Sequence, residues 1–175
     1  EEMNQRKADL IVMGFHRDRP LGGVTLGSCM RHVIAHTDRD VLLTGRRSRV
    51  LYRAALVAWD GEKPIGPAVA RAKYFAPEAE LSIFQMVNSA ADAEPARRWL
   101  ADALCAAGTD DLIENLLVSS DPLGPALIDA VSSVTADLLV MPTRGGQHGD
   151  IGYTAEKIIA ERACDTLCCQ ASCRD

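Results

Sequence analysis

The sequence predicts an α/β protein with a doubly wound, mainly parallel sheet. Two observations lead to this prediction. Short apolar runs, typical of buried parallel strands, alternate along the chain with segments whose apolar residues recur at helical spacing. One such unit, a strand followed by a loop and a helix, occurs twice, beginning at residues 8–14 and again at 136–142. Right-handed crossovers in such a sheet place helices on both faces.

The first copy of the unit spans residues 1–45. Residues 10–13 predict a strand, and residues 41–43 predict a second one. Between them Leu26, Met30 and Val33 lie on one face of a predicted helix. We expect residues 46–50 to be a linker.

Residues 51–175 contain a full series of five strands separated by four helical stripes. Glycine and proline mark several boundaries, because Pro64 and Pro122 suit helix starts and Gly108 suits a helix end. We therefore predict a five-stranded sheet in the order 3-2-1-4-5. The predicted strands are residues 53–59, 81–87, 116–118, 138–141 and 166–171, and the helical stripes centre on residues 65–72, 96–104, 127–134 and 151–159.

The composition excludes some function classes. Apolar residues make up 47% of the chain and charged residues 25%, which is ordinary for a globular protein. A net charge of -5 does not favour nucleic-acid binding, and the arginines at 46, 47, 49 and 53 are either a solvated linker or an anion site. No apolar run is long enough to span a membrane and no signal peptide is visible, so we expect a cytoplasmic protein.

The six cysteines do not have the paired spacing of a zinc site. Cys168 and Cys169 are adjacent, so on a strand they would face opposite sides of the sheet. We expect reduced cysteines that act as small hydrophobic residues and no metal site.

The first strand-loop-helix unit has features of a phosphate-binding loop. Gly14 ends the strand, and a glycine there lets a phosphate approach the backbone closely. Gly27 and Ser28 begin the helix, whose free N–H groups attract an anion, and Ser28 is placed to cap the helix or donate to the anion. Arg17 in the loop either supplies positive charge to a phosphate or is simply exposed.

The two copies align over most of their length. Residues 8–13 pair with 136–141 at an offset of 128, and residues further along pair at an offset of 125, so the second loop is shorter by three residues. The first copy therefore repeats only the last strand-helix-strand part of the complete unit. We expect the strands at 41–43 and 166–171 to pair antiparallel, because each is otherwise an open edge.

The stretch ADLIVMGFHRDRPLGGVTLGSCMRHVIAHTDRDVLL resembles the universal stress protein family. The family motif G-x2-G-x9-G-[S/T] is matched at Gly14, Gly27 and Ser28, whereas Arg17 replaces the second glycine. The resemblance implies a Rossmann-like, adenine nucleotide alpha hydrolase-like fold in a tandem member of the family. Residues 1–45 would be the C-terminal part of a first domain, most of which is missing. Residues 46–50 would form a linker, and residues 51–175 would form a complete second domain.

The resemblance also implies binding of ATP or another adenine nucleotide, in a stress-response module that pairs in tandem or dimerises through its last strand. In the complete domain, Asp60 matches the family's acidic residue that faces the nucleoside. Val87 matches the family position whose backbone contacts the adenine. Pro142 and Tyr153 replace a motif glycine and the phosphate-binding Ser or Thr. The remaining loop positions of this second site are Gly145, Gly146, Gly149 and Gly152.

Catalysis is not favoured by the sequence. His32 and His36 are spaced i, i+4 on a helix, but no HExxH pattern, Walker A loop or nucleophile elbow occurs. We expect no enzyme, or at most weak ATP hydrolysis. The alternative to a nucleotide sensor is a structural or protein-interaction module of the same fold.

Overall fold

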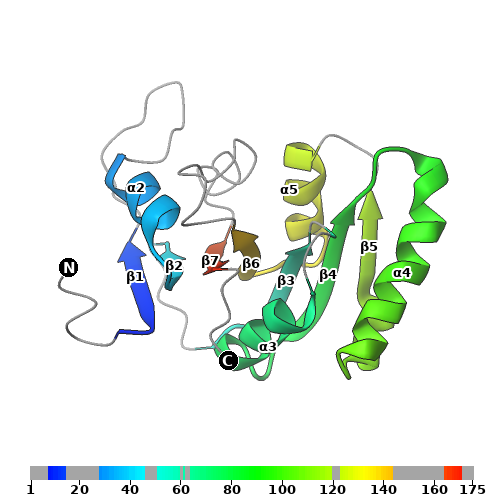
Figure 1. Ribbon diagram of the computed structural model, residues 1–175, viewed down its shortest axis with the longest axis horizontal. Helices are drawn as coiled ribbons and strands as arrows, with labels where there is room; N and C mark the ends of the chain where they lie inside the picture. Colours follow the sequence, from blue (N-terminus) through cyan, green and yellow to red (C-terminus); the bar gives the residue numbers. More distant parts are fainter. Residues whose placement is uncertain are drawn as a thin grey trace.

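The computed structural model describes residues 8–14, 28–45, 51–59, 61, 64–119, 123–143 and 164–170. Within these ranges a seven-stranded sheet runs across Figure 1, with β1 at one end and β5 near the other. Its strands are β1 (Leu10–Gly14), β2 (Asp40–Thr44), β3 (Ala54–Trp59), β4 (Glu80–Met86), β5 (Leu116–Ser119), β6 (Leu138–Thr143) and β7 (Asp165–Gln170). The helices are α2 (Ser28–His36), α3 (Gly66–Phe75), α4 (Ala93–Ala106) and α5 (Leu123–Ser133), with short 3-10 turns η1 (Ala90–Asp92) and η2 (Asp110–Asn115).

The order of the strands is β1-β2-β7-β6-β3-β4-β5. The five strands from β3 onward are parallel to one another and follow the predicted order 3-2-1-4-5. Strands β1 and β2 are parallel to each other, but β2 meets β7 antiparallel, as the sequence predicts. The α/β, mainly parallel fold class is therefore confirmed, with two strands added to the predicted five.

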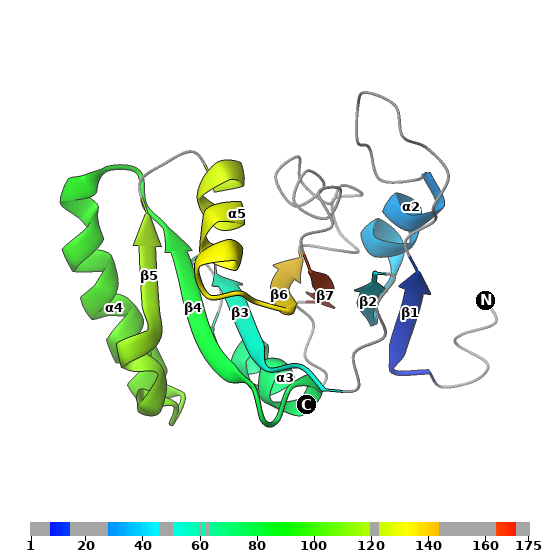
Figure 2. The ribbon, with the colours of Figure 1, turned by 180° about the vertical axis from the view of Figure 1, so that it is seen from behind.

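Helices cover both faces of the sheet. On one face α3 and α4 pack over alternate residues of β3, β4 and β6, including Val57, Ile83 and Val140. On the other face α5 packs over Leu56 and Phe84, and Figure 2 shows it beside β3 and β4. α2 covers β2 and β7 on that second face. The adjacent cysteines of β7 point to opposite faces, as expected, since Cys168 packs with α2 and Cys169 belongs to the first face.

Two predicted boundaries are wrong in detail. The helix expected from Pro64 begins at Gly66, because Pro67 in its first turn has no N–H and the next two N–H groups, of Ala68 and Val69, both donate to the Ile65 carbonyl. The strand expected to end at Met141 continues to Thr143 through Pro142, which lies in register with Cys169 of β7. The helix end at Gly108 is confirmed, since that residue has a φ of 66° and follows α4 directly.

Two aspartates close the antiparallel junction between β2 and β7 in the same way. The N–H of Gln170, which ends β7, donates to Asp40 Oδ1 at 2.9 Å, and the N–H of Gly45, just past β2, donates to Asp165 Oδ1 at 2.7 Å. Asp40 and Asp165 occupy equivalent places in the two copies, and Leu42 pairs with its own counterpart Leu167. The junction therefore has an approximate two-fold symmetry.

A third aspartate fixes the start of β3. Both carboxylate oxygens of Asp137 accept the Arg53 N–H at 3.1 Å, and the N–H of Ala54 donates to one of them at 3.1 Å. Asp137 is buried and directly precedes β6, so it holds β3 in parallel register beside β6.

Replacing Asp165 with alanine should lower the free energy of unfolding by about 2 to 4 kcal/mol. The substitution removes the acceptor of the Gly45 N–H and of the Tyr52 hydroxyl, which donates to Oδ2 at 3.0 Å, and each hydrogen bond to a charged group contributes about 1.5–3 kcal/mol. Urea denaturation measures the loss. The matched control is Asp129→Ala, which removes an exposed aspartate of α5; equal effects of the two variants would contradict the role of Asp165.

Candidate functional site

The carboxyl ends of the parallel strands lie at two opposite edges of the sheet. Because β2 and β7 are antiparallel, the ends of β1 and β2 point away from the ends of β3 to β7. Gly14 of the first predicted site and Val87 of the second are consequently on opposite edges. Among the predicted site residues that the structure describes, Gly14 and Val87 therefore do not share one site. Ligands of doubly wound sheets bind at the edge where the strands end.

The first predicted site has an open approach. Gly14 is exposed at the end of β1, and a Cβ built on it would meet no atom of the described residues within 4 Å. Ser28 is exposed as the first residue of α2, and that helix begins on the side of the sheet where β1 ends (Figure 1). The first N–H groups of a helix have no partner within the helix and favour an anion. Arg17 and Gly27 lie outside the described residues.

The second predicted site has a different geometry. Val87 is buried directly after β4, and its N–H donates to the carbonyl of Ser119 at 2.8 Å, so this N–H already has a partner. Pro142 continues β6 where the first copy ends at Gly14, and the hydroxyl of Thr143 donates to the Cys169 carbonyl at 3.1 Å. The other residues predicted here lie outside the described ranges, namely Asp60, Gly145, Gly146, Gly149, Tyr153 and Gly152.

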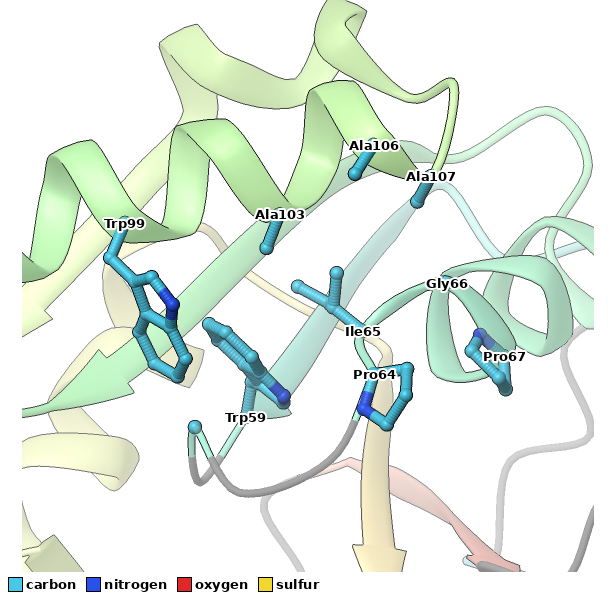
Figure 3. Close-up of a pocket in the computed structure, with 10 residues that line it drawn as sticks. Trp59, Pro64, Ile65, Gly66, Pro67, Trp99, Ala103, Ala106 and Ala107 are labelled. Atoms are coloured by element: carbon cyan, nitrogen blue, oxygen red, sulfur yellow. The ribbon is translucent and has the colours of Figure 1, made fainter.

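A cleft that the sequence did not predict lies beside the end of β3. Its volume is about 490 Å³, and we call it the tryptophan cleft. Figure 3 shows the indoles of Trp59 and Trp99 on one side, Pro64 on the other, and alanines of α4 above. The two indole rings are stacked with centroids 4.7 Å apart. The two tryptophans are forty positions apart in sequence, so their stacking could not be predicted. The one sequence signal for a cleft is the pair of prolines, Pro64 and Pro67, at the start of α3.

Two histidines of the described residues lie together on the exposed side of α2. The rings of His32 and His36 stack on α2 with centroids 4.2 Å apart, and Nδ1–H of His36 donates to the His32 carbonyl at 2.9 Å. Among the residues described, no group of three or more His, Cys, Asp or Glu is arranged to hold a metal ion. None of the described helices has the length and apolar character that crossing a membrane requires.

Burial keeps two thiols of the sheet protonated. Burial raises the pKa of Cys168 to about 12, and the nearby Asp40 carboxylate adds to the effect. Burial and the Asp165 carboxylate raise the pKa of Cys164 to about 12 as well. A thiolate is the reactive form of cysteine, so neither residue is suited to be a nucleophile near neutral pH.

The described residues define a doubly wound α/β protein in which a glycine ends β1 and the helix α2 follows it. Residues 1–45 match the family model described as "Universal stress protein family". That segment is therefore similar to the universal stress protein family, and the chain as described has the fold of solved universal stress proteins. No curated protein matches the chain.

Three solved structures illustrate the likeness. A protein of unknown function from Pseudomonas aeruginosa PAO1 is 20% identical with a TM-score of 0.73, and the match covers 97% of this chain and 66% of that one. A universal stress protein from Archaeoglobus fulgidus DSM 4304 is 18% identical with a TM-score of 0.69, over 97% of this chain and 63% of that one. A universal stress protein in complex with cAMP is 28% identical with a TM-score of 0.51, over 70% of this chain and 99% of that one. This chain thus spans about two thirds of the length of the first two.

Cys164 and Cys168 should resist alkylation in the native protein. At pH 8, iodoacetamide should label the exposed Cys29 and Cys105 and leave Cys164 and Cys168 unlabelled until urea unfolds the chain, which peptide mass spectrometry can resolve.

The raised pKa values also predict that the free energy of unfolding falls as the pH rises from 9 towards 12, because the thiols of the unfolded chain lose their protons at a lower pH than those of the folded chain. Labelling of Cys168 at the rate of Cys29 in the native state would contradict this assignment.

Proposed function

We propose that this protein is a stress-response module that binds an adenine nucleotide at the sheet edge formed by Gly14 and Ser28. The observation that carries the proposal is the open space over Gly14 at the end of β1, with α2 starting at the same edge. The match of residues 1–45 to the universal stress protein family supports it, as does the related protein that was solved with cAMP.

The proposed site binds phosphate through backbone groups. The free N–H groups of the first turn of α2 and the Ser28 hydroxyl donate to phosphate oxygens, while Gly14 leaves room for them. Arg17, from the loop between them, adds positive charge. The role we propose for this edge is binding rather than catalysis.

The edge that carries Val87 and Pro142 favours a second candidate function, that of a structural or protein-interaction module. Pro142 contributes no N–H, and the N–H of Val87 is bonded to Ser119. We therefore propose that the unit of residues 51–175 binds ATP weakly or not at all and acts mainly as a scaffold.

Calorimetric titration of the chain with ATP and cAMP tests the nucleotide proposal. Both should bind more tightly than GTP, and Ser28→Ala should weaken binding by about tenfold or more, because one hydrogen bond to a charged group is lost. Gly14→Ala should weaken it similarly by placing a methyl group in the phosphate path. The added methyl meets no atom within 4 Å, so the fold should be unaffected.

The matched control is Ser132→Ala on α5, an exposed helical serine whose hydroxyl donates only to the Ile128 carbonyl among the described contacts. It should leave nucleotide affinity unchanged. Absence of saturable heat with either nucleotide would overturn the nucleotide proposal and leave the scaffold function. Equal losses in Ser28→Ala and Ser132→Ala would show that Ser28 is not a ligand.

We also propose that the outer edge of β1 pairs with a strand equivalent to β3, supplied by a tandem partner domain or a second copy. β1 is the counterpart of β6, which pairs with β3 on that side, whereas β1 is the last strand of the described sheet. Val12 is 59% exposed, although its counterpart Val140 is fully buried under α3 and α4.

The aspartates that precede these two strands support the pairing. Asp137 accepts the N–H groups of Arg53 and Ala54 at the start of β3. Asp9, its counterpart before β1, has a side chain that is 95% exposed and lies 3.8 Å from an Arg39 nitrogen. Asp9 is therefore placed to accept the first N–H groups of an incoming parallel strand.

Asp137→Ala should lower the free energy of unfolding of this chain by about 2 to 4 kcal/mol, since two part-buried backbone N–H groups lose a charged acceptor. Asp9→Ala should leave it unchanged in urea denaturation. When the partner unit is present in the same molecule or added in trans, Asp9→Ala should become destabilising. An equal loss for both variants in this chain alone would mean that Asp9 already has a structural partner.

A further inference from the structure

The tryptophan cleft exists because α3 starts late. Trp59 is the last residue of β3, and α3 begins only at Gly66, seven positions later. Pro64 is exposed in the connecting segment, and Pro67 lies in the first turn of α3. The connection between strand and helix is thus held open by residues that cannot extend the helix backwards.

Small residues give the cleft its depth. Ala103, Ala106 and Ala107 of α4 line one wall, and the two helices come so close that a Cβ on Gly66 would lie 3.3 Å from the Cβ of Ala107. Larger side chains at these alanines would fill the hollow. None of the described residues that line the cleft carries a charge.

The indole pair is held in a fixed position. Trp59 is buried and Trp99 is 47% exposed, with the ring planes 24° apart. Gly61, with a φ of 79°, lies directly against Trp99, because a Cβ on it would be 2.9 Å from the ring. The pair therefore presents a preformed aromatic surface at the cleft, and aromatic rings prefer offset-stacked or edge-to-face partners.

A buried polar atom lies next to this surface. Gln85 is the register partner of Trp59 on β4 and is 6% exposed. Its Nε2 lies 3.2 Å from the position that a Gly61 Cβ would take, and its Oε1 is buried with no hydrogen-bond partner in the described structure. Buried acceptors in native proteins nearly always have a donor, so an unpartnered one indicates that a donor reaches it in another state.

We propose that the tryptophan cleft binds a small, uncharged molecule with one or two planar aromatic rings and a hydrogen-bond donor. The volume of about 490 Å³ is within the range of small-molecule sites, and the described residues of the lining are aromatic, aliphatic or glycine. The planar ring packs against the indole pair, and its donor reaches Gln85 Oε1. This site is separate from the nucleotide edge at Gly14, and Val87 is not among the residues that line it.

NMR of the indole N–H groups tests the proposal, because the chain has two tryptophans and hence two such signals. The probe is 2-naphthol at pH 7, a neutral two-ring molecule with one O–H donor. Its titration should shift the signals saturably, and cyclohexanol should not. Trp99→Ala and the cleft-filling Ala106→Leu should each weaken 2-naphthol binding by about tenfold.

The matched control is Tyr74→Ala, which removes an exposed aromatic ring of α3 outside the cleft and should leave binding unchanged. The probe 2-methoxynaphthalene has no O–H donor, so it should bind the unmodified chain more weakly than 2-naphthol does. Gln85→Met lacks the acceptor, so this variant should bind the two probes equally. Saturating ATP and Gly14→Ala should have no effect on the probe, so failure of the nucleotide proposal would leave this one standing. The cleft proposal would be overturned if the indole N–H shifts did not saturate with 2-naphthol or were unchanged in Ala106→Leu. It would also be overturned if the same shifts appeared on raising the protein concentration without 2-naphthol.

Discussion

The antiparallel pairing of β2 with β7 is the interaction on which the rest of the structure depends. This pairing joins a two-stranded unit to a five-stranded unit in a single sheet. At each end of the pairing an aspartate, Asp40 or Asp165, accepts a backbone N–H from the opposite segment. The second oxygen of each carboxylate binds a side chain of the larger unit, from Arg71 in one case and Tyr52 in the other. Removing either aspartate would take away the acceptor of a backbone N–H and of a side chain at the same time, so the junction is held by linked contacts.

This junction decides where ligands can bind. Because it reverses the direction of the strands, Gly14 at the end of β1 and Thr143 at the end of β6 belong to opposite edges of the sheet. The two copies have also diverged in complementary ways. The first retains Gly14 and Ser28 at its edge, while the second continues β6 through Pro142 and uses the Thr143 hydroxyl inside the sheet.

Most of the fold could be predicted from the sequence, because apolar periodicity and the internal repeat depend on local spacing. The repeat also predicted the antiparallel junction, since two equivalent last strands would otherwise be open edges. The reciprocal aspartates could not be predicted in the same way, because their partners lie more than a hundred residues away in the chain. Among the site residues, Gly14, Ser28 and Val87 lie at strand or helix ends as expected, but the bond from the Val87 N–H to Ser119 depends on strand neighbours that only the folded sheet brings together.

The contrast between Asp9 and Asp137 shows what the smaller unit lacks. Both residues precede equivalent strands, yet only Asp137 has backbone donors to bind, because only β6 has β3 beside it. Because no described strand pairs with the outer edge of β1, Val12 is exposed, whereas Val140 is buried in the core. The resemblance to universal stress proteins implies that the strand in this place is followed by the acidic residue that faces a nucleoside, which is Asp60 in the larger unit. A parallel strand docked on β1 would therefore complete the hydrophobic face and bring a base-binding group to the edge that already has the phosphate-type loop, so assembly and ligand affinity at Gly14 should rise together.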